Sequence, residues 1–405
     1  MRSPLRTTII LGLLLRVVCI LLFTDIHSDY YWEYGEIAKN VVAGKGFALH
    51  SIEGNIPVRR YSEASHPLPT AYMSPGYVWV LIPLIALHNV ELANILLILL
   101  QTLVSLITMI LIFHFASRIF TPRIGLFSAL AAALLPDFAY AVVSFSPTVL
   151  YHLGVISLFT LLYNEKEKFS ARNLFSVALL CTVLTYFRFE FILYVIILAC
   201  FLALDRRVKE GGIVLAVTIL LLIPWSVRNY ESFGEVVPLG TGAGLNLFRG
   251  NNAEEIGSWG NASTNEALLK IPRDRRFEIV LDSLFRKEAL NFVRRNPVAE
   301  AKNVTLKTCQ LWFFSSLRPT PYNALYILTS VFASLFFVLG VVKTWSWQTH
   351  KYLYLYLIYS TFLAMVFFAL PRHQTMMRIG MIPFIGAGIE VVWEYIRHKS
   401  RSYTA

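Results

Sequence analysis

The fold of this protein is decided by two consecutive segments near its N-terminus. Residues 7–24 read TTIILGLLLRVVCILLFT, and residues 25–47 read DIHSDYYWEYGEIAKNVVAGKGF. The first segment is apolar apart from Arg16 and is about long enough to cross a bilayer. The second begins with acids and continues with closely spaced tyrosines, which are enriched at the level of lipid headgroups. We therefore expect a membrane span followed directly by a helix that lies along the membrane surface.

The composition extends this interpretation to the whole chain. Of the 405 residues, 56% are hydrophobic and only 15% are charged, which excludes an ordinary soluble domain. The net charge of +11 is spread between apolar runs instead of forming one stripe, so we expect no nucleic-acid partner. The four cysteines have neither metal nor redox spacing, and we interpret them as packing residues.

The distribution of apolar runs predicts an all-α integral membrane protein with about ten transmembrane helices. The expected spans are residues 7–24, 92–115, 124–145, 148–163, 172–187, 191–204, 212–227, 323–342, 352–370 and 379–395. Residues 77–87 are apolar but too short to cross, so we expect an interfacial helix there. With an inside N-terminus every inner loop is basic, which places both termini in the cytoplasm.

Two longer segments then lie on the outer side, each with an expected amphipathic juxtamembrane helix. The chain divides into a transmembrane module, residues 1–227, which includes the first outer loop, residues 25–91. An outer-face region follows over residues 228–322, and C-terminal transmembrane helices occupy residues 323–405. In the outer-face region, apolar residues from Phe277 to Val293 keep helical spacing.

Charged side chains at the outer surface are the candidates for chemistry, because a charge at the membrane edge requires a partner or a function. They are Asp25, Asp29, Glu33, Glu36, Arg59, Arg60, Glu63, His66, Arg188, Glu190, Arg228, Arg318, Arg372, His373 and Arg378. Arginine suits bidentate binding of phosphate, and a carboxylate can accept a proton from an attacking hydroxyl. The alternative is that the acids only cap a helix while the arginines pair with them or reach lipid headgroups.

Asp137 and the glycine-rich loop over residues 240–250 are two further features that bear on a possible site. Asp137, next to Pro136 in the third span, is either a polar contact at a helix break or part of a site. The glycine-rich loop over residues 240–250 has no Gly-Lys-Ser/Thr ending, so we expect a tight loop over a cleft and not a nucleotide site. Neither a Gly-x-Ser-x-Gly elbow nor a His-Glu-x-x-His helix is present, which argues against common esterase and protease chemistry.

An ordered set of short motifs carries a resemblance to a known family. The set consists of Arg16 in the first span, Asp29-Tyr30-Tyr31 with Ile37-Ala38 and Gly44-Lys45-Gly46-Phe47, Ser74-Pro75-Gly76-Tyr77, Arg188-Phe189-Glu190, Pro224-Trp225-Ser226-Val227-Arg228-Asn229-Tyr230, Gly244-Leu245-Asn246 with Gly250-Asn251-Asn252, Arg294-Arg295-Asn296-Pro297, and Arg378 followed by Pro383. The chain thus resembles the polytopic GT-C glycosyltransferases, in particular the glycosyltransferase family 39-like group of protein mannosyltransferases and aminoarabinose transferases.

The resemblance implies a cavity at the outer face in which a sugar passes, with inversion, from a polyprenyl-phosphate carrier to a lipid, glycan or protein acceptor. It places the catalytic aspartate in the first outer loop, where Asp29 matches. We expect Asp29 to act as general base and Arg228, Arg372 or Arg378 to bind the donor phosphate, with Arg59 and Arg60 as lesser candidates. Asp25, Glu190, Asp137 and His66 are further candidate site residues.

The chain departs from the family pattern at two places. Many relatives carry an acid after the aspartate, where this chain has Tyr30, and an acid at the outer end of the third span, where it reads Ser146-Pro147-Thr148. The sequence therefore does not support a divalent metal or any other cofactor.

The expected location is the cytoplasmic membrane with an outward-facing site. A lipid-linked-glycan transporter or scaffold, and a polysaccharide polymerase or ligase, are the alternative functions.

Overall fold

The computed structural model describes residues 2–29, 31–51, 66–163, 169–253, 256–257, 262–315 and 324–402. Its helices are α1 (Arg2–Phe23), α2 (Trp32–Val42), α3 (Pro75–Ile85), α4 (Val90–Ile119), α5 (Pro122–Leu134), α6 (Pro136–Tyr140), the short 3₁₀ helix η2 (Ala141–Val143), α7 (Thr148–Leu162), α8 (Ala171–Phe187), α9 (Phe191–Leu204), α10 (Val208–Phe233), α11 (Ala243–Gly250), α12 (Ala262–Leu269), α13 (Phe277–Arg295), α14 (Pro297–Trp312), α15 (Ala324–Thr344), α16 (Trp347–Val366) and α17 (Pro371–Ser402). Two-residue strands β1 (Ala48–Leu49) and β2 (Leu68–Pro69) pair antiparallel. The predicted all-α class is confirmed for the described residues.

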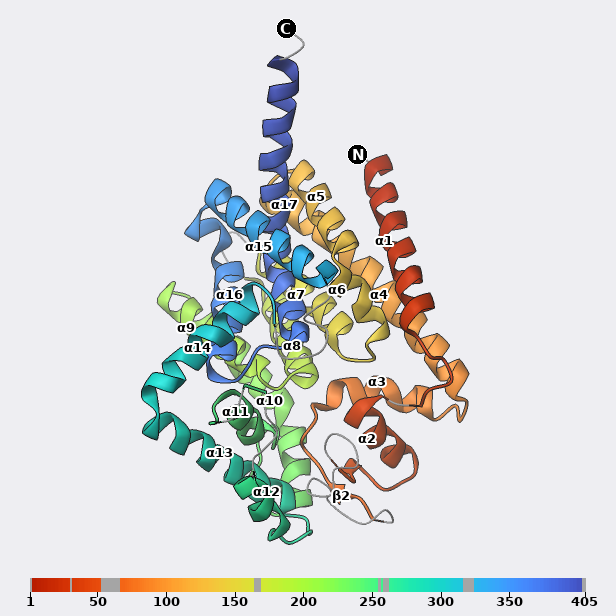
Figure 1. Cartoon of the computed structure of the whole chain (residues 1–405), viewed down its shortest axis with the longest axis vertical. Coiled ribbons are helices and arrows are strands. Elements are labelled where there is room, and N and C mark those ends of the chain that lie inside the picture. The colour runs from red at the N-terminus through yellow and green to blue at the C-terminus, as the bar shows by residue number, and fades with distance from the viewer. Residues whose placement is uncertain are drawn as a thin grey trace.

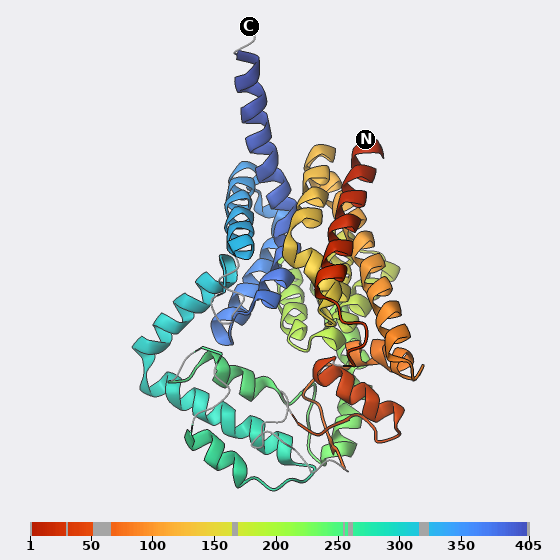
Figure 2. The same cartoon turned by 45° about the vertical axis from the view of Figure 1, so that its right-hand side comes forward.

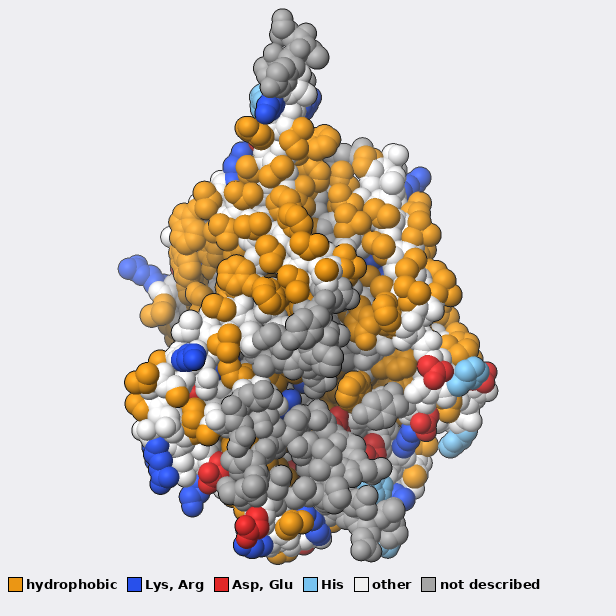
Figure 3. Space-filling view, in the orientation of Figure 1, with side chains coloured by type: hydrophobic (Ala, Val, Ile, Leu, Met, Phe, Trp, Pro, Cys, Tyr) orange, Lys and Arg blue, Asp and Glu red, His pale blue; other side chains and the backbone are white. Residues whose placement is uncertain are grey.

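The helices form a tall bundle with a separate layer at one end (Figures 1 and 2). The bundle contains α1, α4 to α10 and α15 to α17, whereas α2, α3, β1, β2 and α11 to α13 make the layer at the end far from both chain termini. The space-filling view shows hydrophobic side chains over the bundle and most charged ones around the layer (Figure 3). We call this layer the outer layer. The assignment of the opposite end to the cytoplasm stays a prediction.

Every predicted span overlaps one or more helices, but fewer helices are both long enough and apolar enough to cross a membrane by themselves. Among the described residues, α1, α4, α10, α15 and α17 meet length and composition requirements, and α5 with α6 and η2 adds a sixth span bent by 61°. The helices α7, α8 and α9 are apolar but have only 15, 17 and 14 residues. A multi-pass membrane protein is thus supported, and the number of ten spans stays a prediction.

The bend between α5 and α6 has a local cause. Pro136 has no N–H, so it leaves the carbonyl of Ala132 without its helical donor. The Arg16 guanidinium donates to that carbonyl at 3.4 Å, and Gln101 Nε2 donates to the carbonyl of Val142 at 2.7 Å. Two buried polar side chains from α1 and α4 therefore satisfy the backbone that the broken helix exposes, as a membrane interior requires.

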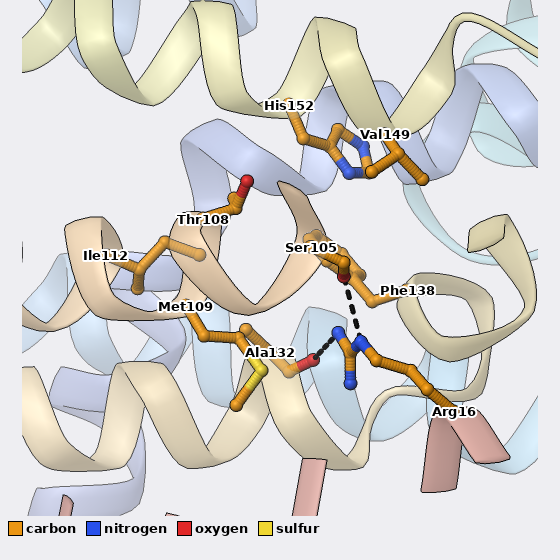
Figure 4. A pocket seen from close by; sticks show the side chains of 9 residues that line it. All are labelled: Arg16, Ser105, Thr108, Met109, Ile112, Ala132, Phe138, Val149 and His152. Carbon is orange, nitrogen blue, oxygen red and sulfur yellow. Dashed lines mark hydrogen bonds between the residues drawn. The ribbon is translucent and has the colours of Figure 1, made fainter. Parts of the chain in front are cut away.

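A narrow cavity adjoins Arg16 inside the bundle (Figure 4). Its lining consists of Arg16, Ser105, Thr108, Met109, Ile112, Ala132, Phe138, Val149 and His152. Arg16 is fully buried, and its Nε donates to Ser105 Oγ at 2.8 Å while Nη1 donates to the Gly12 carbonyl at 3.0 Å. These bonds explain how a guanidinium is held in the bundle.

Helices on the two sides of the outer layer pack through their apolar faces. The predicted surface helix after the first span exists as α2, and it buries Ile37 and Ala38 completely. The second predicted amphipathic helix exists as α13, and its Phe285 ring lies 5.0 Å from the Phe248 ring of α11. The apolar face of α13 is thus turned toward α11. Figure 1 shows α3 lying across the end of the bundle, and its 11 residues are too few for a crossing.

Candidate active site

Three arginines from three separate parts of the chain converge where the outer layer meets the bundle. We call Arg188, Arg249 and Arg372 the arginine cluster. Arg188 lies in the turn between α8 and α9, Arg249 at the end of α11, and Arg372 in the first turn of α17. All three guanidinium groups act electrostatically on the imidazole of His373, the residue after Arg372. Three cations within electrostatic range of one residue can together attract an anionic group.

Contacts from the outer layer fix the turn that carries Arg188. Ser74 Oγ, just before α3, accepts a hydrogen bond from the backbone N–H of Phe189 at 3.2 Å. The Phe189 ring lies so close to Gly240 that a side chain at that glycine would collide with it. Within the turn, Arg188 forms an ion pair with Glu190, and both side chains are mostly buried. This turn is therefore a rigid support for one cation and one carboxylate.

The segment between α16 and α17 contacts Arg249 and leads directly to Arg372. The Arg249 guanidinium lies over the Phe368 ring, 4.5 Å from its centroid, and the residue is only 3% exposed. His373 Nδ1 lies 3.1 Å from the Phe368 carbonyl and 3.3 Å from the Leu370 backbone nitrogen. Arg372 is exposed, and its position in the first turn of a long helix adds the positive end of the helix dipole.

Tyr34 of α2 connects the arginine cluster with the first outer segment. Burial raises the pKa of Tyr34, and the positive charges of Arg188 and Arg372 oppose this rise. The carboxylates of Glu190 and Glu33 act on the same phenol and reinforce the rise. The Tyr34 hydroxyl is therefore within electrostatic range of Arg188 and Arg372, which brings the helix after Asp29 near the arginine cluster.

Asp29 itself lies at the entrance to α2 and is exposed. Lys39 Nζ donates to its carboxylate at 2.7 Å and to its backbone carbonyl at 2.8 Å. The hydrogen bond and positive charge of Lys39 lower the pKa of Asp29. Asn94 of α4 holds the preceding backbone by donating to the Ser28 carbonyl at 2.8 Å, and its amide oxygen accepts from the Tyr31 hydroxyl at 2.6 Å. Asp29 is therefore ionised and held in a defined place.

Two of the predicted phosphate-binding arginines are engaged in contacts within the fold. Arg228 Nη2 donates to the Phe47 carbonyl at 2.6 Å, Nη1 donates to the Thr70 carbonyl at 2.8 Å, and the guanidinium lies 5.1 Å from the centroid of the Trp225 ring. These bonds fasten the first outer segment to α10. Their existence favours a positioning role for Arg228.

Arg378 is similarly occupied. It is 3% exposed and forms an ion pair with Asp137 at 2.6 Å, while Nη2 donates to Ser330 Oγ at 2.7 Å. Asp137 also accepts from Thr375 Oγ1 at 3.0 Å. Of the two alternatives that the sequence left open for Asp137, the contact at the helix break is the one that this geometry favours. The pair joins α6 to α15 and α17.

Among the described residues, neither Asp25 nor His66 has a hydrogen bond or ion pair with the arginine cluster. Asp25 accepts from the His27 backbone N–H at 2.9 Å in a local turn, and His66 is exposed. Arg59, Arg60, Glu63 and Arg318 lie outside the described residues. Where relatives carry a second acid, the hydroxyls of Ser144, Ser146 and Thr148 form a chain with oxygen separations of 2.8 and 3.0 Å. Within the described ranges, His, Cys, Asp and Glu nowhere gather in threes as a metal would require.

Sequence reasoning missed Arg249 and Tyr34 as members of the site. Tyr34 stood out only as one apolar position of an amphipathic helix. Arg249 follows an apolar run in a loop of glycine and asparagine, a position where a single cation has little other purpose. This isolated charge was the signal in the sequence that Arg249 could belong to a site. The signal could not be interpreted without knowing that α11 packs beside the start of α17.

The comparisons with known proteins agree with this architecture. Residues 65–227 match the family model described as dolichyl-phosphate-mannose-protein mannosyltransferase. The oligosaccharyltransferase AglB from Archaeoglobus fulgidus, in its apo form, matches with a TM-score of 0.56 and 14% identity over 99% of this chain and 51% of that one. The same protein in complex with an inhibitory peptide and a dolichol-phosphate matches with a TM-score of 0.56 and 12% identity over the same shares.

A third solved structure, ArnT from Cupriavidus metallidurans bound to undecaprenyl phosphate, matches with a TM-score of 0.40 and 14% identity over 94% of this chain and 76% of that one. No curated protein sequence matches. The chain spans about half the length of the archaeal oligosaccharyltransferase. The solved oligosaccharyltransferase structures show that this chain shares their fold, and the predicted resemblance to protein mannosyltransferases agrees with the family model that matches part of the chain. The part of the chain that resembles the protein mannosyltransferases runs from residue 65 to residue 227.

Proposed function

We propose that this protein transfers a sugar from a polyprenyl-phosphate-linked donor to a lipid, glycan or protein acceptor at the outer face of the cytoplasmic membrane. The observation that carries the proposal is the arginine cluster, of which Arg188 and Arg372 act electrostatically on Tyr34 in the helix directly after Asp29. Cations suited to a phosphate and carboxylates suited to a proton thus meet at one end of an apolar bundle. The relatives whose solved structures contain dolichol-phosphate or undecaprenyl phosphate support this choice of donor.

In the proposed mechanism, the donor phosphate binds to Arg372 with Arg188 and Arg249 near it. The bond between the sugar carbon and the phosphate oxygen breaks through an oxocarbenium-like state, and the acceptor oxygen or nitrogen attacks from the opposite face, which inverts the configuration. The leaving phosphate needs no proton, so cationic stabilisation takes the place of a general acid. A carboxylate accepts the proton of the acceptor.

Asp29 is the proposed base, and Glu33 is the second carboxylate to be tested. Lys39 lowers the pKa of Asp29, so the carboxylate is free of a proton and able to accept one, although this contact also reduces its basicity. Glu33 is 7% exposed and lies in the first turn of α2, next to Tyr34 in the sequence. The two carboxylates are close in sequence but differ in exposure, so their individual replacement separates them.

The experiment compares surface glycolipids, glycans and glycoproteins of a deletion strain by mass spectrometry, and then complements the strain with variants. We expect a monosaccharide to be missing in the deletion strain and to return with the wild-type protein. Asp29→Asn should fail to restore it, although the variant is produced in the membrane at the wild-type level. Restoration by Asp29→Asn together with failure of Glu33→Gln would transfer the role of base to Glu33. A deletion strain with unchanged glycans would reject the proposal.

Binding of polyprenyl phosphate to the purified protein tests the cationic seat separately. Arg372→Gln should weaken binding, and the loss should shrink as salt rises, because screening already weakens the contact in the wild type. Lys287→Met, which removes an exposed charge on α13, is the control. Equal affinities for Arg372→Gln and the wild type would remove Arg372 from the donor site.

The alternative functions give other outcomes in the same experiments. A lipid-linked-glycan transporter or scaffold would leave Asp29→Asn active in complementation, because neither role needs a base. A polysaccharide polymerase or ligase would change polymer length or attachment without the loss of a single monosaccharide. The GT-C fold and the arginine cluster outside the apolar bundle favour the transferase.

A further inference from the structure

The helix α14 is amphipathic, and its two faces have different environments. Its inner face carries Glu300, Lys307 and Leu311, all buried. On the opposite face, Val298 is 83% exposed, Leu306 is 46% exposed, and Phe313, which directly follows the helix, is 49% exposed. With the exposed residues Lys302 and Cys309, these positions form one stripe at helical spacing. We call this stripe the α14 stripe.

Basic residues accompany the α14 stripe. Arg294 and Arg295 end α13 immediately before α14, and Lys302 lies within the stripe. All three side chains are exposed. An apolar stripe with lysine and arginine beside it is typical of a helix that lies in the headgroup region of a bilayer, where cations meet lipid phosphates.

The far end of α14 is fixed at the level of the apolar bundle. Trp312 Nε1 donates to Thr361 Oγ1 of α16 at 3.2 Å, and Ser334 of α15 donates to the Trp312 carbonyl. Figures 1 and 2 show α14 rising from the corner with α13 toward α15. The stripe thus leads to the exposed leucines of α15, such as Leu325 and Leu328, in a helix long and apolar enough to span a membrane.

We infer that α14 lies in the outer-layer headgroup region, with the α14 stripe against lipid and with Arg294, Arg295 and Lys302 on anionic phospholipid headgroups. The inner face of the same helix contacts the end of α11, beside Arg249 of the arginine cluster. Lys307 Nζ donates to Asn251 Oδ1 at 2.8 Å and to the Gly250 carbonyl at 3.2 Å, next to Arg249. The membrane surface and the candidate active site are therefore connected through one helix.

Fluorescence quenching in lipid nanodiscs tests the inference on the full chain. Cys309 is exposed on the α14 stripe and serves as a native labelling site once Cys19, Cys181 and Cys200 are replaced. Val298→Cys, in a background that also lacks Cys309, reports on the start of the stripe. Ser283→Cys in that background is the control, because Ser283 is exposed on α13.

Nitroxide-bearing phospholipids should quench an environment-sensitive fluorophore at position 298 or 309 and leave most of the emission at position 283. A water-soluble quencher should show the reverse order. Labels at 298 and 309 that behave like the label at 283 would overturn the inference. Shielding of those two labels from both quenchers would also overturn it, since a protein partner or a second copy would then cover the stripe.

The headgroup charge is tested by lipid composition. Quenching at position 298 should be stronger in nanodiscs that contain phosphatidylglycerol than in pure phosphatidylcholine, and the difference should vanish in the Arg294→Gln/Arg295→Gln/Lys302→Gln variant. Equal quenching in both lipids for the parent protein would reject the role of the three basic residues. These measurements use no sugar donor, so they are independent of the proposed transfer reaction.

Discussion

The replacement of Lys307 by methionine tests whether α14 supports the candidate site. Lys307 is fully buried, and its ammonium group donates to Glu300 Oε1 at 3.1 Å as well as to Asn251 and the Gly250 carbonyl. Lys307→Met leaves the Glu300 carboxylate, whose side chain is 12% exposed, without its cation. Removal of one partner of a buried ion pair costs about 3–5 kcal/mol of unfolding free energy.

A double replacement separates the effect of the unpaired Glu300 charge from the effect of the lost hydrogen bonds. In Lys307→Met/Glu300→Gln no charge is buried without a partner, and the remaining loss is that of hydrogen bonds to Asn251 and Gly250, about 1–3 kcal/mol. The double variant should therefore be more stable than the single one. Lys287→Met, an identical replacement at an exposed position of α13, should change stability by less than about 0.5 kcal/mol.

The assay is thermal unfolding of the purified protein in detergent, with all variants heated at one scan rate because unfolding of a membrane protein is commonly irreversible. The midpoint of Lys307→Met should fall by roughly 5 °C, given the entropy of unfolding of a chain of this size. The double variant should recover part of that loss. A single variant as stable as the wild type, or a double variant less stable than the single one, would refute the reasoning.

Two further predictions concern α11 and Asp29. Gly250→Ala should destabilise the protein and reduce donor binding, because a methyl group at this position would overlap the Phe367 carbonyl. The control is Gly212→Ala, whose methyl group meets open space, so this variant should be neutral or slightly stabilising in the same thermal assay. Lys39→Met should raise the pKa of Asp29 toward its ordinary value, so the acid limb of kcat/KM should move to higher pH; an unmoved limb would show that Asp29 is not the base.

The direction of this pH effect follows from the sign of the shift. Lys39 lowers the pKa of Asp29 in the folded protein, so the stabilising contact is fully present above the ordinary aspartate pKa and is lost as the pH falls through the lowered value. Asp29 and Lys39 are both well exposed, with 64% and 42% of their side chains accessible, so salt should weaken the contact. The stability change is therefore expected to be small, and the pH profile is the more sensitive readout.

The sequence alone determined the fold class and the membrane setting. Long apolar runs predicted the helices because backbone groups in lipid must pair within their own segment. Local spacing was also enough for α2 and α13, and the ordered motifs were enough to indicate the resemblance to protein mannosyltransferases that residues 65–227 carry. These features depend on residues that are close together in the chain, so the sequence pattern is sufficient to predict them.

Only the tertiary structure decided which charged residues share a site. Arg228 and Arg378 looked like Arg372 in the sequence, but packing gives the first to backbone carbonyls and the second to Asp137. Arg249 joins Arg372 because α11 packs against the segment before α17. A guanidinium has the same chemistry at every position in a chain, and its partner is set by which helices come together across more than a hundred residues. That information is carried by packing and not by local spacing.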